Sequence, residues 1–160
     1  MLADFQSLQN VRNGMAVKRF HTTPTIQQNT VAQHSLGCAA LLYLIYDDPS
    51  PAVVKAAIHH DFFEYYTGDI PSPAKRSGLV RVTGLPENPC AELSEVERRQ
   101  LKFVDCFEGM LFCCEERLLG NRNLIGVFNT YLNYIEALNL DQVERGWVIL
   151  ITSKYYGFPE

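Results

Sequence analysis

Four side chains that can bind transition metals lie at separate places in this sequence, each within a run of apolar residues. His34 lies in VAQHSL, His60 and Asp61 are neighbours in AAIHHDFFE, and Asp105 lies in FVDCF. A single histidine among apolar residues is more often a hydrogen-bonded core residue, but a buried carboxylate is costly unless it is paired or binds a cation. Two imidazoles together with two carboxylates therefore predict a metal site.

The donor set limits the kind of metal and the kind of site. A mixture of nitrogen and oxygen ligands suits Mn, Fe, Co, Ni or Zn, whereas calcium prefers oxygen ligands alone. Four protein ligands on an ion that prefers six leave two positions for water and substrate. Structural zinc sites are instead closed by four ligands, often thiolates. The sequence thus predicts a catalytic centre. His59 points about 100° away from His60 around a helix, and we expect it to lie outside the ligand set.

Hydrophobic periodicity predicts that helices carry all four residues. Asn29 or Thr30, Ser50 and Asp141 are candidate N-caps, and Pro51 suits the first position of a helix. The sequence contains no period-2 segment of useful length and no internal repeat. We expect an all-α fold of about six helices in one domain, at about residues 2–13, 30–45, 51–66, 91–119, 124–138 and 141–155.

The segment 68–89 contains four prolines and three glycines and has no clear period. We expect a long irregular loop, and loops of this length are usually functional or mobile. The long helix that follows is expected to bury one apolar face made of Leu93, Val96, Leu101, Val104, Phe107, Leu111, Cys114 and Leu118.

The composition is that of an ordinary globular protein. Apolar residues make up 47% of the 160 residues and the net charge is −4, so the basic footprint of a duplex-binding protein is missing. The longest apolar run, CAALLYLIY, has nine residues, whereas a membrane span needs about 20. The first ten residues lack the basic-then-apolar order of a signal peptide. Five cysteines without a Cys-x-x-Cys pair are expected to be reduced core residues of a cytoplasmic protein.

These segments resemble, in order and spacing, the separated His, His-Asp and Asp elements of the HD-domain metal-dependent phosphohydrolases. The run TGDIPSPAK after Glu64 and the pair of Arg19 and Phe20 are similar to two branches of that family. These branches are the bacterial 5′-deoxynucleotidases and the small phage dATP triphosphohydrolases of 2-aminoadenine genomes. The resemblance covers residues 18–121, and we expect the remaining C-terminal residues to add only helices. It implies a single HD domain over residues 1–160.

By this resemblance, His34, His60, Asp61 and Asp105 hold one divalent metal ion. Co, Zn or Mn is expected, with Mg weaker, because imidazole ligands favour the later transition metals. Such an ion lowers the pKa of a bound water and polarises a phosphoryl oxygen.

The resemblance also credits Glu64 and Asp69 with proton handling. In-line attack on the α-phosphorus of a nucleotide must expel the sugar 5′-oxygen, which is a poor leaving group unless it is protonated. Glu64 lies three residues after Asp61, and on one continuous helix the two carboxylates would share a face. Because neighbouring carboxylates raise one of their pKa values, we expect Glu64 and Asp69 to keep a proton at neutral pH.

Three basic residues are candidates for binding phosphate. Arg19 can grip phosphate oxygens in a bidentate manner. By resemblance to the triphosphate-specific phage enzymes, Lys75 and Lys102 hold the β- and γ-phosphates. Lys102 lies three residues before Asp105 and shares a helix face with it.

The same resemblance assigns Phe20, Thr22 and Pro73 to the substrate pocket. Phe20 can stack on a purine, but it stands where the relatives usually carry tryptophan, and Thr22 replaces a more apolar residue. Stacking alone does not select adenine.

Three functions remain open at this point. The first is a deoxynucleoside triphosphate triphosphohydrolase that acts on dATP, and the second is a 5′-deoxynucleotidase that acts on monophosphates. The third is a regulatory module that has kept the fold and lost the chemistry, although such modules typically lose metal ligands. Binuclear members of the superfamily need additional histidines, so that His21 and His59 would both have to serve as ligands.

The expected partner is a small-molecule deoxynucleotide, with no role for nucleic acid or membrane. Relatives form dimers or hexamers, and the segments TYLNYIEAL and GWVILITSKYY carry more apolar surface than one small bundle needs. We therefore expect a homo-oligomer in the cytoplasm, or in the host cytoplasm if the chain is encoded by a phage.

Overall fold

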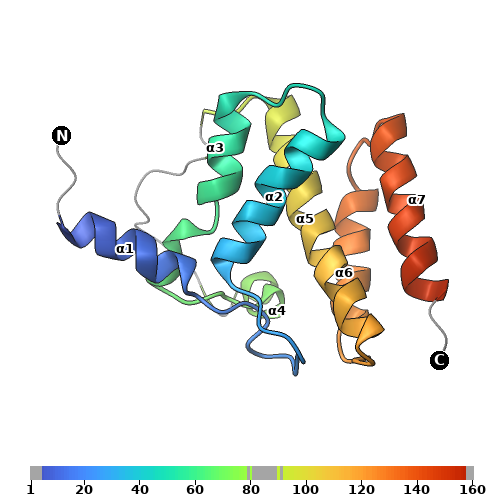
Figure 1. The fold of residues 1–160 in the computed structure, drawn as a ribbon, viewed down its shortest axis with the longest axis horizontal. Coiled ribbons are helices and arrows are strands. Elements are labelled where there is room, and N and C mark those ends of the chain that lie inside the picture. Colours follow the sequence, from blue (N-terminus) through green and yellow to red (C-terminus); the bar gives the residue numbers. More distant parts are fainter. Residues whose placement is uncertain (1–4, 79, 81–89, 91, 158–160) are drawn as a thin grey trace.

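The computed structural model describes residues 5–78, 80, 90 and 92–157. Within these residues the chain forms seven α-helices and one 3-10 helix, η1 (Figure 1). No strand occurs in the described part of the chain, where the only bridge joins Lys18 and Thr30. The predicted all-α fold is confirmed. The elements in chain order are α1 (Phe5–Met15), α2 (Val31–Ile45), α3 (Pro51–His59), η1 (Phe62–Tyr65), α4 (Ser72–Arg76), α5 (Glu95–Leu118), α6 (Ile125–Glu136) and α7 (Gln142–Gly157).

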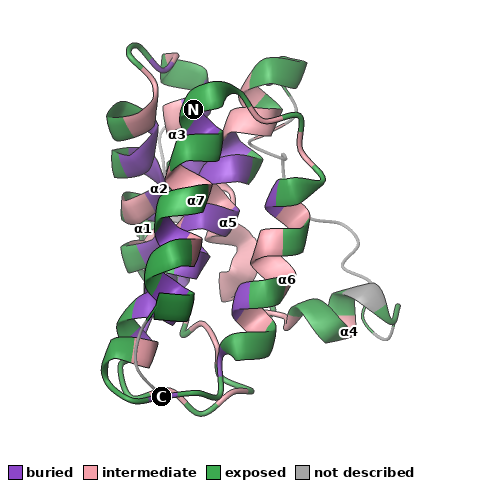
Figure 2. Ribbon diagram, turned by 90° about the vertical axis from the view of Figure 1, so that its right-hand side faces the viewer, coloured by how far each residue is buried: buried purple, intermediate pink, exposed green. Residues whose placement is uncertain are grey.

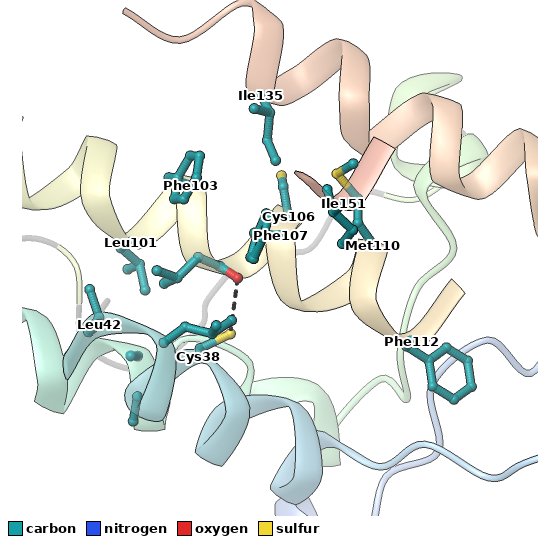
Figure 3. Packing of buried hydrophobic residues seen from close by; sticks show 14 of the residues in the cluster. Cys38, Leu42, Leu101, Phe103, Cys106, Phe107, Met110, Phe112, Ile135 and Ile151 are labelled. Atoms are coloured by element: carbon teal, nitrogen blue, oxygen red, sulfur yellow. Dashed lines mark hydrogen bonds between the residues drawn. The ribbon is translucent and has the colours of Figure 1, made fainter. Parts of the chain in front are cut away.

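The long helix α5 forms the centre of the fold. Helices α2 and α3 pack on one side of it, and α6 and α7 pack on the other (Figure 1). Its buried side chains therefore point in several directions, as Leu101 and Phe103 show in Figure 3. The prediction of a single apolar face is wrong at Val96, Leu111 and Leu118, which are exposed. Val96 and Leu118 lie in the first and last turns of the helix.

Side-chain caps fix where three helices begin. Thr30 forms a capping box at the start of α2, and Ser50 caps α3 with Pro51 at its first position. Both predicted starts are confirmed. Ser94 forms a capping box with Glu97, which satisfies N–H groups that would otherwise lack partners. Helix α5 therefore begins at residue 95 and not near residue 91.

The third predicted helix is wrong beyond His59, where α3 ends. His60 is the C-cap of α3, and η1 begins only after Asp61. Aromatic residues such as those of η1 would lose side-chain freedom in an α-helix. In the structure they form a 3-10 helix that packs against α1. A Cβ atom on Gly14 would lie 2.8 Å from the carbonyl oxygen of Phe62. Gly14, in the last turn of α1, thus permits this approach, and the helix ends at Met15, beyond the end predicted at residues 13–14.

The segment predicted as an irregular loop contains the short helix α4. This helix lies at the periphery of the fold, away from the buried core (Figure 2). Residues 79 and 81–89 of the same segment lie outside the described residues. None of the five cysteines forms a disulfide, and four of them are buried. None of the described helices combines the length and apolar character that a bilayer span requires.

Candidate metal centre and pocket

The four predicted metal ligands come together although they lie on different elements. His34 lies on α2, His60 and Asp61 lie at the break between α3 and η1, and Asp105 lies on α5. Nε2 of His34 is 3.2 Å from Oδ1 of Asp105 and 3.7 Å from Oδ2 of Asp61. Nε2 of His60 is 3.6 Å from Oδ2 of Asp61 and 3.9 Å from Oδ1 of Asp105. Two imidazole nitrogens therefore face two carboxylate oxygens.

Hydrogen bonds orient both imidazole rings toward this cluster. Nδ1 of His34 donates to Oε2 of Glu108, and Nδ1 of His60 donates to the carbonyl oxygen of Ala57 at 2.9 Å. Each Nε2 lone pair is then free to bind a cation. Nε2 of His60 is buried and has no hydrogen-bond partner among the described residues. An unpaired polar atom at this depth is costly, and a metal ion would satisfy it.

The spacing and charge of the cluster fit a transition-metal ion. Metal bonds of about 2.0–2.2 Å place neighbouring ligand atoms roughly 3.0–3.5 Å apart, close to the observed distances. Burial raises the pKa of Asp105, but the nearby His34, His60 and Lys102 side chains outweigh this effect and hold the pKa well below its usual value. Burial lowers the pKa of His60, whereas Asp61 and Asp105 raise it, to about 9. The cluster thus favours positive charge at this place.

Cys38 also lies beside the two histidines and offers an alternative donor. The ligand atoms of His34, Cys38 and His60 lie within 4.8 Å of one another. The Cys38 thiol, however, points to the carbonyl oxygen of Val104 at 3.8 Å, and burial raises its pKa well above the usual value. Because only a thiolate binds metal well, the two aspartates complete the donor set better than Cys38.

A cavity of about 560 Å³ lies next to this cluster. Its volume falls in the range of roughly 300–1,000 Å³ that is typical of small-molecule sites. The two aspartates belong to its wall, with side chains 23% and 20% exposed, so they are less deeply buried than the sequence analysis assumed. The other predicted residues that line the cavity are Arg19, Phe20, Thr22, Glu64, Asp69, Pro73, Lys75 and Lys102.

Glu64 lies on η1 and not on the same helix as Asp61, yet both side chains line the cavity. The premise of one continuous helix is therefore wrong, while the expected juxtaposition is present. Burial and the negative charges of Asp61 and Asp69 raise the pKa of Glu64 to about 8, against the opposing effect of Lys75. Oε2 of Glu64 is buried without a partner in the described part of the chain. Glu64 is thus protonated at neutral pH.

Asp69 connects the cavity to the loop that precedes α2. Its Oδ2 atom accepts a hydrogen bond from the backbone N–H of Phe20 at 3.2 Å. Phe20 has a φ of 57°, which is strained for an aromatic residue. Its ring stacks on Phe112 with centroids 4.8 Å apart, so Phe112 covers one face. The guanidinium of Arg19 also lies over this ring, 5.2 Å from its centroid, so a base that stacks on Phe20 would have to share the ring with both contacts.

The side chain of Arg19 is held by three hydrogen bonds. Its NH1 group donates to Oδ1 of Asn29 at 3.4 Å and to Oε2 of Glu108 at 3.3 Å. Its NH2 group donates to the hydroxyl of Tyr131 at 3.5 Å. A guanidinium has five N–H donors, and the other two have no partner among the described residues. Arg19 therefore keeps donors for a ligand in the cavity that it lines.

The two lysines contact carboxylates of the same cavity. Nζ of Lys75 lies 3.7 Å from Oε1 of Glu64, and Nζ of Lys102 lies 2.9 Å from Oδ2 of Asp105. Lys102 also lies 5.2 Å from the centroid of the Tyr134 ring. Lys75 comes from α4 and Lys102 from α5, so basic side chains reach the cavity from two elements.

Sequence reasoning missed Glu108 and the contribution of α6. Glu108 contacts both His34 and Arg19. Its position three residues after Asp105 places both carboxylates on one face of a helix, which is a signal too general to identify it. The expectation that the C-terminal residues add only helices is wrong, because Val127, Thr130 and other side chains of α6 line the cavity. Helix α6 packs along α5, which brings it to the site.

Neither His21 nor His59 joins the ligand cluster. His21 is exposed, and the ring of His59 packs edge-on against Phe62 at 5.8 Å. Neither residue lines the cavity. The two additional histidines that a binuclear centre would need therefore lie outside the ligand cluster.

Comparisons with known proteins agree with the geometry. The model of a family described as HD domain matches residues 15–99. Among solved structures, the PH0347 protein from Pyrococcus horikoshii OT3 is similar with a TM-score of 0.77 and 21% identity, over 94% of this chain and 99% of that chain. The cyanophage S-2L HD phosphohydrolase DatZ, bound to dA and one catalytic Zn²⁺ ion, is similar with a TM-score of 0.73 and 18% identity, over 99% of each chain. A search of curated proteins finds no significant match.

Proposed function

This chain belongs to the HD-domain family, and we propose that it is a metal-dependent phosphohydrolase that cleaves dATP into deoxyadenosine and triphosphate. The observation that carries the proposal is the meeting of two kinds of group at one cavity. The aspartates of the ligand cluster line it together with three basic side chains, Arg19, Lys75 and Lys102. The cavity thus offers a place for a divalent ion beside places for phosphate oxygens.

His34, His60, Asp61 and Asp105 are the residues proposed to hold the ion, which would be Zn, Co or Mn, with Mg weaker. When bound, such an ion lowers the pKa of a water to about 7 and polarises a phosphoryl oxygen. The orientation of both Nε2 atoms supports this assignment. The zinc ion of the similar cyanophage protein supports zinc as the first candidate.

Glu64 is the proposed general acid. Its pKa of about 8 keeps it protonated at neutral pH, and its unpaired Oε2 atom can donate that proton to the 5′-oxygen of the leaving deoxynucleoside. Asp69 is proposed to assist in two ways. Its charge helps to raise the pKa of Glu64, and its hydrogen bond to Phe20 fixes the loop that carries Arg19.

The basic side chains are proposed to divide the phosphate chain among them. Arg19 has two free donors and can hold oxygens of one phosphate in a bidentate manner. Lys75 and Lys102 reach the cavity from α4 and α5 and are proposed to bind the β- and γ-phosphates. Because four carboxylates, counting Glu108 and leaving out the protonated Glu64, accompany three basic groups around this site, an anionic ligand also depends on the metal ion for charge balance.

The deoxynucleoside is proposed to bind between Phe20 and the wall that α6 supplies. Thr22 and Pro73 line the same cavity and would contact the base or the sugar. The cyanophage protein, which is bound to dA, supports adenine as the first base to test.

A 5′-deoxynucleotidase that acts on dAMP is the second candidate, and one observation favours it. The side chains of Lys75 and Lys102 are 53% and 47% exposed and already contact Glu64 and Asp105. If these contacts persist when substrate binds, Arg19 alone would hold a single phosphate. A regulatory module has less support, because all four ligands and Glu64 are present at one site.

Separation of reaction products distinguishes the two enzymes. Metal-loaded protein is incubated with dATP, dADP and dAMP, and phosphate, diphosphate and triphosphate are resolved chromatographically. Release of triphosphate from dATP in one step is the expected result. Exclusive turnover of dAMP would establish the deoxynucleotidase, and release of single phosphates from dATP would contradict attack at the α-phosphorus.

The assembly and location of the protein are also proposals. Val143, Ile149, Leu150 and Tyr156 on α7 are large apolar side chains that are about half exposed or more, and they support a homo-oligomer, either a dimer or a hexamer. Five cysteines without a disulfide support a reducing compartment such as the cytoplasm, which would be that of the host for a phage-encoded chain.

A further inference from the structure

One carboxylate, that of Glu108, contacts both the candidate metal cluster and the candidate phosphate-binding arginine. Its Oε2 atom accepts a hydrogen bond from Nδ1 of His34 and one from NH1 of Arg19 at 3.3 Å. The side chains of Arg19 and Glu108 are only 8% and 13% exposed, and that of His34 is fully buried. Hydrogen bonds to a charged acceptor in such surroundings are strong and directional.

Two glycines in helix interiors leave room for this arrangement. A Cβ atom on Gly37, in α2, would lie 2.8 Å from Cγ of Glu108. A Cβ atom on Gly109, in α5, would lie 2.5 Å from the ring of Tyr131, whose hydroxyl accepts a hydrogen bond from Arg19. Glycine is less favourable than alanine inside a helix. Each of these two glycines therefore leaves room for a side chain that accepts a hydrogen bond from Arg19.

We propose that Glu108 is a positioning residue that fixes His34 and Arg19 relative to each other. The proposal rests on the proposed function, which assigns His34 to the metal ion and Arg19 to phosphate. The bond from His34 leaves Nε2 as the metal-binding atom and holds the ring in place, as carboxylates commonly do for metal-bound histidine. The bond from Arg19 holds in place a side chain that lines the cavity and keeps two donors for phosphate. One side chain thus couples the position of the metal ion to that of the phosphate.

The test uses Glu108→Gln in the metal-loaded protein and two binding measurements. Zn²⁺ affinity is measured by competition with a chromophoric chelator in the absence of nucleotide. Binding of inorganic triphosphate to the zinc-loaded protein is measured by calorimetry. We expect Zn²⁺ affinity to fall about 10–100-fold and triphosphate affinity to fall in parallel, because both contacts are lost together. Arg19→Lys should weaken only triphosphate binding, which separates the two ends of the link.

A second variant keeps Glu108 and displaces it. Gly37→Ala introduces the Cβ atom that would crowd Cγ of Glu108, and it should weaken both affinities in the same direction as Glu108→Gln. Glu115→Gln is the matched control, since Glu115 is an exposed residue of the same helix outside the cavity, and it should change neither affinity.

Three outcomes would overturn the inference. The first is a Glu108→Gln protein with unchanged affinity for both probes and only a lower Tm. This result would show that Glu108 has a purely structural role. The second is the loss of one affinity with the other intact. The third, which also decides the matter if Glu108→Gln does not fold, is a Gly37→Ala protein that binds both probes as wild type does. Both probes are independent of turnover, so a wild-type protein that binds them without cleaving any nucleotide would contradict the proposed function and leave this test in force.

Discussion

Nε2 of His34 lies 3.2 Å from Oδ1 of Asp105, although His34 belongs to α2 and Asp105 to α5. These helices pack directly on each other, and the contact places the buried imidazole beside a carboxylate that lines the cavity. Asp61 and His60 complete the cluster from the break after α3. Because the donors come from three separate parts of the chain, the packing of helices positions the predicted metal ligands.

Removal of one ligand is the first prediction. Asp105→Ala or His34→Ala should abolish hydrolysis and lower bound metal, since three donors hold an ion less well than four. Metal content is measured by mass spectrometry after gel filtration. His21→Ala, at an exposed histidine, should retain metal and activity. Full activity of the wild type in metal-stripped buffer would contradict the prediction, and Co, Mn or Zn should restore the stripped protein better than Mg.

Replacement of the proposed acid is the second prediction. Glu64→Gln keeps the size of the side chain and removes the proton that leaves for the 5′-oxygen. The turnover number should fall roughly 10²–10⁴-fold, the usual contribution of general acid catalysis, while KM changes little. Steady-state kinetics with dATP measures both constants. Glu136→Gln, at an exposed position of α6, is the control and should leave both unchanged. Normal turnover by Glu64→Gln would show that Glu64 only interacts with solvent and Lys75.

The dependence of activity on pH is the third prediction. Since the pKa of Glu64 is raised to about 8, the acid form is present at neutral pH and is lost as the pH rises through about 8. The turnover number of the wild type should therefore fall on the alkaline side. Glu64→Gln should lack this decrease. A wild-type profile that stays level up to about pH 9 would mean that another group donates the proton.

The same shift predicts how stability changes with pH. The folded protein keeps the Glu64 proton up to about pH 8, whereas the unfolded chain releases it near pH 4.5. Between these values the folded state binds more protons than the unfolded state, so the free energy of unfolding falls as the pH rises. Glu64→Gln lacks this effect. Thermal unfolding of the metal-free proteins should show the variant gaining in Tm relative to wild type from about pH 5 to about pH 8. A constant difference would show that the Glu64 pKa is not shifted.

Much of the fold could be predicted because local signals agree with it. Thr30 and Ser50 are caps in both sequence and structure. The break at His60 could not be predicted, because it depends on η1 packing against Gly14 in α1, a contact between segments far apart in sequence. Periodicity alone continues the helix through the aromatic residues.

The candidate site likewise has parts that the sequence predicts and parts that it does not. The predicted ligands and Glu64 belong to motifs that are recognisable in sequence. The structure brings the four predicted ligands into one cluster, and Asp61, Asp105 and Glu64 line the cavity beside it. Glu108 carries no such motif. Its role depends on the approach of α2 to α5, which Gly37 permits. The wall that α6 supplies likewise follows from packing, so neither feature has a signal in local residue spacing that is specific enough on its own.

The choice between triphosphate and monophosphate is the last prediction, and it depends on Lys75 and Lys102. Both lysines line the cavity with Arg19, and a phosphate chain that extends from the metal centre would exchange their present carboxylate contacts for phosphate oxygens. Truncation of either lysine to alanine should weaken the binding of dATP by about 1–3 kcal/mol per lost contact. We expect the lower part of that range, since both side chains are about half exposed and solvent screens such pairs.

The measurement compares dATP with dAMP, ATP and dGTP on wild type, Lys75→Ala and Lys102→Ala, with Lys55→Ala as the control at an exposed lysine of α3. The two cavity variants should raise KM for dATP and scarcely change that for dAMP, because only the triphosphate reaches them. Metal content is checked for Lys102→Ala, as Lys102 contacts Asp105 at 2.9 Å. Equal or faster cleavage of dAMP by the wild type, together with unaffected lysine variants, would assign the protein to the deoxynucleotidases, because Arg19 would then be sufficient to hold the one phosphate that reacts.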